Sequence, residues 1–178
     1  MARMNETVSV ALSPTDGAST APVDFESFFR DEHERLFRAL SLLTRDPHEA
    51  EEVMQDAFLR LWERWDRVGV GPDPVAYLYR TAMNVWRSRL RRAAVAARKT
   101  LRPDRPIDDL AEIEGRDAVV RALGGLPARQ RAAIVLMDVL DLSSERAGAA
   151  LGIRPVTVRV LAARARASLA MKMEERHD

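Results

Sequence analysis

The sequence predicts an all-α protein of two small helical domains, an N-terminal helical bundle and a C-terminal four-helix domain, joined by a flexible linker. Three observations lead to this class. Apolar residues recur every three or four positions in several long segments, no alternation typical of strands persists, and only eight glycines occur in 178 residues. With 47% apolar and 31% charged residues, the chain has the composition of a folded globular protein.

The N-terminal domain is expected over residues 23–92, after a disordered tail over residues 1–22. The apolar core of this tail, Val8 to Leu12, is only five residues long and therefore too short for a signal peptide. Asp24 is well placed to cap a first helix over residues 25–44, whose leucine and phenylalanine residues give it a broad apolar face.

A second helix is predicted from Pro47 to Val68, after the sequence "RDP" breaks the first one. It carries the most regular apolar stripe in the chain: Ala50, Val53, Met54, Ala57, Phe58, Leu61, Trp62, Trp65 and Val68. Polar residues occupy the other face: Glu51, Glu52, Gln55, Asp56, Arg60 and Glu63. Taken alone, such a face is typical of a helix surface that contacts only water.

The sequence "GVGPDP" predicts a loop, and Pro74 stands near the start of a third helix. The buried side of that helix is expected to consist of Val75, Leu78, Ala82, Val85 and Trp86. Its basic run, "YRTAMNVWRSRLRR", mixes guanidinium groups with aromatic and amide side chains. Single-stranded nucleic acid binds such mixtures, because cations contact phosphates and planar groups hold an unstacked base. The alternative is that Tyr79 and Trp86 belong to the core and the arginines to an ordinary surface.

Residues 93–113 lose the apolar periodicity, and Pro103 and Pro106 argue against a continuous helix, so this segment is predicted to be the linker. The formal net charge of +1, from 28 basic and 27 acidic residues, conceals a separation of charges along the chain. Nine Lys or Arg residues lie between Arg80 and Arg105 against one acidic residue, whereas "IDDLAEIEGRD" holds five carboxylates.

The C-terminal domain, residues 114–173, is predicted to contain four helices. Gly124 and Gly125 close the first, Pro127 opens the second, Ser143 or Ser144 caps the third, and Gly152 turns into the fourth. Gly148, inside the third of these helices, is expected to cost it ~1 kcal/mol relative to alanine.

The last helix has two unlike sides on a helical wheel. Its core stripe is Val158, Leu161, Ala162, Ala165 and Leu169. The opposite side is small and basic, with Val156, Val160 and Ala163 at its centre and Arg159 and Arg164 beside them. A short helix, a tight turn at "LGI" and such a second helix are typical of a helix-turn-helix, whose second helix enters the DNA major groove. The arginines then contact guanine edges or phosphates, and the apolar residues contact thymine methyl groups. For this stretch alone, a basic solvent-exposed helix remains the alternative.

Composition excludes several classes of function. No cysteine occurs and the three histidines are scattered, so neither a metal site nor a cofactor is expected. No paired carboxylates, no nucleophile with a base and no phosphate-binding glycine loop occur at a usable spacing, so the chain is not expected to be an enzyme. No segment approaches the ~20 apolar residues of a membrane span. The sequence therefore predicts a cytoplasmic protein without a membrane segment of its own.

Two motif sets, in this order, resemble the extracytoplasmic-function group of bacterial sigma factors, the two-domain initiation subunits of RNA polymerase. The first is "HEAEEVMQDAFLRLWERW" followed by "AYLYRTAMNVWRSRLRR", and the second is "ALGGLPARQRAAIVL" followed by "LGIRPVTVRVLAARARASL". The likeness runs from Phe25 to Leu169. It implies a protein that directs core polymerase to promoters, reading the −35 duplex and melting and reading the −10 element.

The resemblance also assigns residues and partners. The set implied to bind the β′ clamp helices of core polymerase is Glu52, Gln55, Asp56 and Arg60. The set implied to bind −10 DNA is Arg80, Asn84, Arg87, Arg91 and Arg92. The set implied to bind −35 DNA is Arg154, Val156, Thr157, Arg159, Val160, Ala163 and Arg164. The resemblance further implies contact with the polymerase β flap, an anti-sigma factor as inhibitory partner, and chemistry carried out by the polymerase.

Two other classes of function stay open at this point. A stand-alone helix-turn-helix regulator, binding paired half-sites as a dimer, would leave the first domain without a role. A protein-binding helical adaptor would bind polymerase without supporting initiation.

Overall fold

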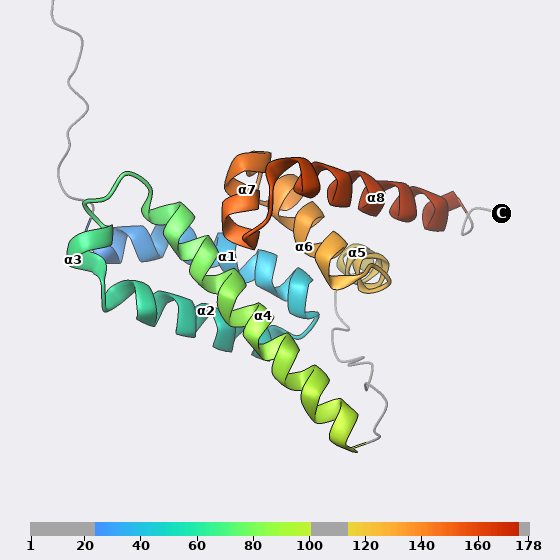
Figure 1. The fold of residues 1–178 in the computed structure, drawn as a ribbon, viewed down its shortest axis with the longest axis horizontal. Helices are drawn as coiled ribbons and strands as arrows, with labels where there is room; N and C mark the ends of the chain where they lie inside the picture. Colours follow the sequence, from blue (N-terminus) through green and yellow to red (C-terminus); the bar gives the residue numbers. More distant parts are fainter. Residues whose placement is uncertain (1–23, 101–113, 175–178) are drawn as a thin grey trace, which may run out of the picture.

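The computed structural model describes residues 24–100 and 114–174, and every regular element in these ranges is helical (Figure 1). The first module consists of α1 (Phe25–Thr44), α2 (Pro47–Trp62), α3 (Trp65–Val68) and α4 (Pro74–Thr100). The second module consists of α5 (Glu114–Gly124), α6 (Ala128–Ile134), the π-helical stretch η1 (Val135–Val139), α7 (Ser144–Leu151) and α8 (Pro155–Glu174). The all-α class is confirmed, whereas the tail predicted over residues 1–22 and the linker beyond residue 100 lie outside the described residues.

The ends of α1 and the start of α2 follow the predicted local signals. Asp24 caps α1, because its carboxylate accepts a hydrogen bond of 3.0 Å from the Ser27 amide. Arg45 ends α1 in a left-handed conformation with φ 64°. Asp46 then caps α2 by accepting a hydrogen bond of 2.8 Å from the His48 amide, and Pro47 follows at the first helical position.

The second predicted helix is shorter than expected, since α2 ends at Trp62 and α3 begins only at Trp65. The prediction of one helix up to Val68 is therefore wrong. The break turns the Trp65 ring back onto α1, where its centroid lies 5.2 Å from that of Phe25 and 5.0 Å from that of Phe28. Aromatic packing across the two helices thus outweighs the continuity of the stripe.

The third predicted helix is longer than expected, since α4 continues to Thr100 and takes in the first eight residues of the predicted linker. Ala93 to Ala96 are exposed in this extension, which projects beyond the body of the molecule (Figure 1). Alanine and arginine are strong helix formers, so residues 93–96 stay helical although they are exposed. The loss of apolar periodicity therefore indicates where α4 becomes exposed to solvent, and does not indicate where the helix ends.

The four helices predicted in the second module are α5 to α8, with η1 extending α6. Ser143 caps α7 by accepting a hydrogen bond from the Arg146 amide, and Gly152 ends it with φ 63°. The turn that follows α7 packs directly on Gly148, which is buried, and the Ile153 amide donates to the Gly148 carbonyl at 3.0 Å. Gly148 thus has a packing role that offsets the expected loss of helix propensity.

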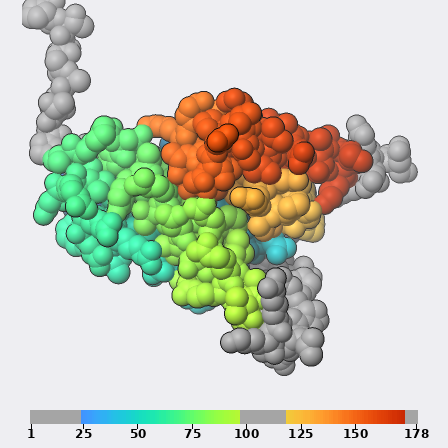
Figure 2. Space-filling view, in the orientation of Figure 1, coloured from blue at the N-terminus to red at the C-terminus, as the bar shows by residue number. Residues whose placement is uncertain are grey.

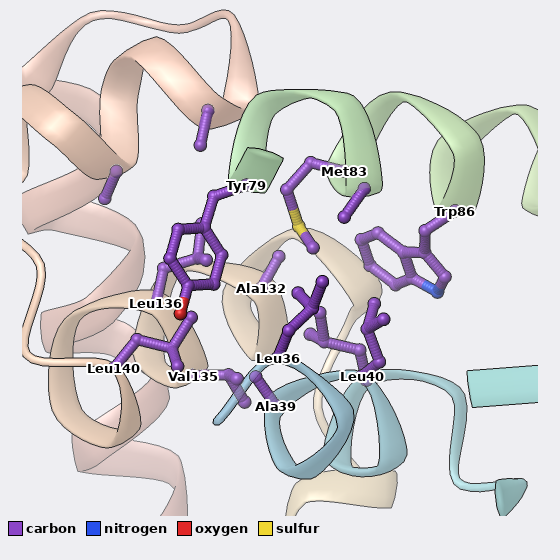
Figure 3. Close-up of a cluster of buried hydrophobic side chains, with 14 of the residues drawn as sticks. Leu36, Ala39, Leu40, Tyr79, Met83, Trp86, Ala132, Val135, Leu136 and Leu140 are labelled. Carbon is purple, nitrogen blue, oxygen red and sulfur yellow. The ribbon is translucent and has the colours of Figure 1, made fainter. Parts of the chain in front are cut away.

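The two modules share one hydrophobic core (Figure 3). It joins Leu36, Ala39 and Leu40 of α1 and Tyr79, Met83 and Trp86 of α4 with Ala132, Val135, Leu136 and Leu140 of the second module. Along its rim α4 packs on α7, and α1 packs on η1 and α6. Burial of apolar surface is the main favourable contribution to folding, so this core holds the modules together. We call the result the closed arrangement.

Two arginines of the first module add hydrogen bonds across the closed arrangement. The Arg35 guanidinium donates to the Leu140 carbonyl, and the Arg87 guanidinium donates to the Leu151 carbonyl. Both acceptors are main-chain oxygens of the second module. These bonds supply the directional contacts that a purely apolar core lacks.

Candidate functional site

The four residues predicted for polymerase binding, Glu52, Gln55, Asp56 and Arg60, lie on the outer side of α2 and form what we call the α2 polar face. Glu52, Gln55 and Arg60 are exposed, and Asp56 is half-buried. Gln55 donates a hydrogen bond of 3.2 Å to Glu51 one turn earlier. The structure therefore brings all four together on one accessible surface.

Two members of the α2 polar face also hold α2 to α4. The Arg89 guanidinium donates to Asp56 Oδ2 at 3.1 Å and to Glu52. The hydrogen bond to Glu52, followed by that to Asp56, raises the pKa of Arg89 above its usual value. A substitution at Asp56 would consequently disturb the contact between two helices as well as any contact with a partner.

The α2 polar face continues into two exposed apolar residues that the sequence did not assign to it. Leu59 and Trp62 are each 58% exposed, and with Gln55 they follow the spacing i, i+4 and i+7 that lines up one side of a helix. The placement of Trp62 in the buried stripe is therefore wrong, although its ring centroid still lies 4.7 Å from that of Phe25. The available signal was Leu59, an apolar residue standing outside the stripe.

Four of the five residues predicted for −10 DNA share one side of α4. Arg80, Asn84, Arg87 and Arg91 follow the spacing i, i+4, i+7 and i+11, and we call this the α4 basic face. Arg92 lies on another side, in a shallow depression that it lines with Asp46, Glu49 and Arg89. The five residues therefore do not form one patch, and the spacing along the helix is the signal that separates Arg92 from the other four.

The side chains of the α4 basic face are organised by their neighbours. The Arg80 guanidinium lies 5.6 Å from the centroid of the Tyr77 ring, a cation–π distance. Arg87 donates to Asn84 Oδ1 at 2.5 Å and to the Leu151 carbonyl. Burial, and then the charges of Arg91 and Arg129, lower the pKa of Arg87.

The closed arrangement places α7 against the α4 basic face. Figure 2 shows the second module lying directly on α4. Beside the bond from Arg87, Arg146 of α7 forms an ion pair of 2.5 Å with Asp73, which precedes α4. Arg87 is thus partly covered and bonded within the chain, whereas Arg80, Asn84 and Arg91 remain exposed.

The aromatic residues of the basic run belong to the core. Trp86 is 2% exposed and Tyr79 is 1% exposed, so neither offers a stacking surface for a base. The Tyr79 hydroxyl donates a hydrogen bond of 2.9 Å to Glu32. Burial, and then the charge of Glu32, raise the pKa of Tyr79 well above its ordinary range. Of the two interpretations offered by the sequence, core packing is correct for both residues.

The helix-turn-helix predicted from the sequence is formed by α7 and α8. All seven residues predicted for −35 DNA are exposed: Arg154, Val156, Thr157, Arg159, Val160, Ala163 and Arg164. We call this the α8 face. On the opposite side of the same helix, Val158, Ala162 and Ala165 are fully buried. The wheel drawn from the sequence is therefore confirmed in its orientation.

Two arginines of α8 make contacts inside the second module. Arg159 donates to Ser144 Oγ at 2.8 Å and lies 3.7 Å from Glu145. Arg166, outside the predicted set, binds both carboxylate oxygens of Asp138 at 2.8 and 2.5 Å. Arg166 therefore anchors α8 to η1, while Arg159 stands at the edge of the α8 face.

Across residues 24–100 and 114–174, no group of three His, Asp or Glu side chains is arranged to hold a metal ion. None of the helices in those ranges is both long enough and apolar enough to span a bilayer.

Two family models match the chain in order. The Sigma-70 region 2 model matches residues 28–96, and the Sigma-70, region 4 model matches residues 116–169. The chain is 35% identical over 147 residues to the ECF RNA polymerase sigma factor SigM of Mycobacterium tuberculosis. The aligned region covers 82% of this chain and 75% of SigM. It is 31% identical over 159 residues to the RNA polymerase sigma-E factor of Streptomyces avermitilis. Here the aligned region covers 86% of this chain and 87% of the relative.

Solved structures share the fold. One is the sigma factor RpoE in complex with the anti-sigma factor NepR from Bartonella quintana, with a TM-score of 0.72 and 23% identity over 85% of this chain and 97% of that one. Another is CnrH in complex with the cytosolic domain of CnrY, with a TM-score of 0.64 and 25% identity over 85% and 88%. The arrangement of helices described above therefore has counterparts of known structure.

Proposed function

This chain belongs to the extracytoplasmic-function group of sigma-70 factors, the subunits that direct RNA polymerase to promoters, and from this premise we propose how its helices divide that task. Residues 23–92 act as region 2, which binds core polymerase and the −10 element. Residues 114–173 act as region 4, which binds the −35 element. Residues 93–113 connect them and begin as the projecting end of α4.

The α2 polar face, together with Leu59 and Trp62, docks on the β′ clamp helices of core polymerase. Exposed leucine and tryptophan beside charged residues supply the mixture of apolar anchors and polar rim that protein interfaces use. Arg89 supports this surface from behind by holding Glu52 and Asp56 in place. Region 4 adds a second contact, with the β flap.

The α4 basic face binds the −10 element once its strands separate. Arg80, Arg87 and Arg91 contact phosphates, and the Asn84 amide holds a base, because one helical side carries all four groups. Capturing an extruded base offsets an unstacking cost of a few kcal/mol. Arg92 contributes charge near the same strand from its separate side of α4.

The α8 face reads the −35 duplex in the major groove. The observation that carries this assignment is that the seven predicted residues are all exposed while the opposite stripe is buried. Arg154 and Arg164 are placed for guanine edges or phosphates, and Val156 and Val160, 52% and 44% exposed, for thymine methyl groups. Arg159 reaches DNA from the edge of the face.

One solved structure of the same fold, the sigma factor RpoE, is in complex with the anti-sigma factor NepR, and on that basis we assign an anti-sigma partner to this chain as well. The polymerase carries out the chemistry of RNA synthesis, and the sigma factor supplies position and strand capture. Its place of action is the cytoplasm, where polymerase and promoters are found.

A reconstituted transcription assay tests this function. The chain is mixed with core polymerase and a library of promoter fragments, and the transcripts are sequenced. Defined start sites are expected, and the double variant Val156→Glu, Val160→Glu should lose them while still binding polymerase. DNA binding without polymerase would instead identify a stand-alone regulator. Polymerase binding without transcripts would identify an adaptor.

A further inference from the structure

Two arginines from different modules meet where the end of α1 lies against α5 and α6. Arg45 directly follows α1, and its side chain passes over Gly124 at the end of α5. A Cβ atom at position 124 would stand 3.2 Å from Arg45 Cδ and 3.3 Å from Nη1, so glycine permits this approach. Arg131 of α6 lies close by. Burial, and then the charge of Arg45, lower the pKa of Arg131.

Arg131 is buried, and none of the residues that the structure describes supplies a counter-charge to it. It is only 7% exposed, and its Nε is buried with no hydrogen-bond partner in the described part of the chain. No carboxylate among the described residues forms an ion pair with Arg131 or with Arg45. Buried charges in proteins are almost always paired, because removing an ion from water costs several kcal/mol. The junction therefore carries one buried guanidinium, that of Arg131, and beside it the exposed Arg45, and no carboxylate of the described residues pairs with either.

The geometry points to a carboxylate as the matching group. A guanidinium binds a carboxylate through two parallel N–H···O bonds, and a second guanidinium beside it can share the charge. Access to Arg131 is narrow, since so little of it reaches the surface. A carboxylate at the tip of a flexible side chain can enter such an opening, whereas a sugar-phosphate backbone is too bulky.

We propose that Arg45 and Arg131 form a carboxylate-binding site at the junction of the two modules, occupied by an aspartate or glutamate of an acidic partner protein. The bound carboxylate contacts both modules and therefore favours the closed arrangement. In that arrangement Arg87 donates to Asn84 and to the Leu151 carbonyl of α7, so the partner keeps Arg87 of the α4 basic face from DNA. This inhibitory consequence rests on the proposed function, whereas the site itself does not.

A binding experiment without polymerase or promoter tests the site directly. A synthetic peptide of ten glutamates is titrated calorimetrically into the purified full chain at low ionic strength. The wild type is expected to bind, and Arg131→Met and Arg45→Gln should each weaken binding about tenfold or more. Arg38→Gln on α1 and Arg129→Gln on α6 remove the same charge from exposed positions, and should change affinity by about twofold at most. Equal losses in all four variants would overturn the site.

Thermal unfolding gives a second measurement that does not depend on the peptide's affinity. Because an unpaired buried guanidinium contributes no stability, Arg131→Met should unfold at the same or a higher temperature than the wild type. The peptide should raise the melting temperature of the wild type and not that of the variant. A melting temperature several degrees lower in Arg131→Met would mean that Arg131 is already partnered, which contradicts the proposal.

Two further titrations separate the possible sources of the anion. If Arg131→Met weakened binding of a ten-nucleotide single strand or a short duplex as much as it weakened peptide binding, the site would be a phosphate site. If a chain with Asp108→Asn, Asp109→Asn and Glu112→Gln bound the peptide more tightly than the wild type, the chain's own carboxylates would be the occupants. Either result would overturn the assignment to a partner, and unchanged behaviour in both supports it.

Discussion

At the scale of single residues, Gly148 shows how a turn can dictate the residue on which it packs. The position that a Cβ would take at 148 is 2.8 Å from the Ile153 carbonyl oxygen and 3.4 Å from the Pro155 nitrogen. Both atoms belong to the backbone that joins α7 to α8, so neither can move aside without changing the angle between the two helices. Any side chain at this position therefore acts on the geometry of the helix-turn-helix.

Gly148→Ala is expected to destabilise the protein by about 1–3 kcal/mol, the usual cost of forcing extra volume into a packed site. Helix propensity alone predicts the reverse, a gain of ~1 kcal/mol. Urea unfolding followed by circular dichroism distinguishes the two. The matched control is Ala149→Gly. The neighbouring Ala149 is exposed, so this substitution should show the effect of helix propensity alone. A more stable Gly148→Ala protein would contradict the packing argument.

Leu59→Glu tests the apolar extension of the α2 polar face. Leu59 is 58% exposed and, unlike Asp56, is not part of the ion pairs to Arg89, so a change there should leave the fold intact. Loss of an apolar anchor is expected to weaken binding to core polymerase about tenfold or more, as for other interface hot spots. Fluorescence anisotropy with a labelled chain measures the affinity for core polymerase. Val119→Glu on α5, at a site 50% exposed, should keep wild-type affinity.

The burial of a side chain was predictable from the sequence where the residue lies well inside the apolar stripe of its helix. Trp62 was not, because it lies between the stripe and the polar face, touching Phe25 while exposing much of its ring. Periodicity assigns each position to one side or the other, and a large side chain at the border occupies both. Arg131 is a second case, since nothing in a helical pattern marks a buried arginine.

At the scale of elements, α4 places two neighbouring arginines on different sides of the helix. Arg91 belongs to the α4 basic face, whereas Arg92 lines the depression with Asp46 and Glu49. Burial, and then the charge of Asp46, raise the pKa of Glu49, so this side of α4 already faces carboxylates. Adjacent positions on a helix point about 100° apart, which makes the pair an internal comparison.

Arg91→Gln is expected to weaken capture of single-stranded −10 DNA by the polymerase holoenzyme and to lower the salt dependence of binding by about 0.7 in the log–log slope. Arg92→Gln should change both quantities less, although the two substitutions remove the same charge. Affinities measured over a series of salt concentrations give the slopes. Equal slopes for the two variants would mean that the whole basic run, and not one side of α4, contacts the strand.

Helix starts and ends were predictable because caps are local. Asp24, Ser143 and Gly152 each act through bonds within four residues of themselves. The end of α4 and the break after Trp62 were not, since α4 continues through exposed residues that carry no apolar periodicity and the break depends on Trp65 packing against another helix. Both outcomes were decided by contacts, or their absence, that a local pattern does not contain.

At the scale of the whole molecule, the closed arrangement uses groups that the proposed function assigns to promoter binding. Arg87 cannot donate to the Leu151 carbonyl and to a DNA phosphate with the same N–H, and Arg146 ties α7 to the start of α4. The side-chain hydrogen bonds and the ion pair between the modules join positions more than sixty residues apart, so no sequence pattern predicted them. Both modules were predictable from the sequence, and their packing on each other was not.

Opening of the closed arrangement can be followed by energy transfer. The chain has no cysteine, so Val70→Cys and Met171→Cys, 73% and 62% exposed, place one dye on each module. Binding of core polymerase is expected to lower the transfer efficiency. In the free chain, Arg146→Glu should shift the closed-to-open ratio by up to about fivefold, because an exposed ion pair contributes at most ~1 kcal/mol. Adding Asp73→Arg to Arg146→Glu should restore the closed-to-open ratio of the wild type. A transfer efficiency that does not change when core polymerase binds would contradict the competition.

The two bonds that Arg35 and Arg87 make to main-chain carbonyls have an evolutionary consequence. Every amino acid carries a carbonyl, so positions 140 and 151 can drift in identity without losing the acceptor, provided that the replacement keeps the backbone path. The donors have no such freedom, since only a long cationic side chain reaches across. Among descendants of this chain, substitutions should therefore be rare at the donors, Arg35 and Arg87, and more frequent at the acceptor positions, 140 and 151.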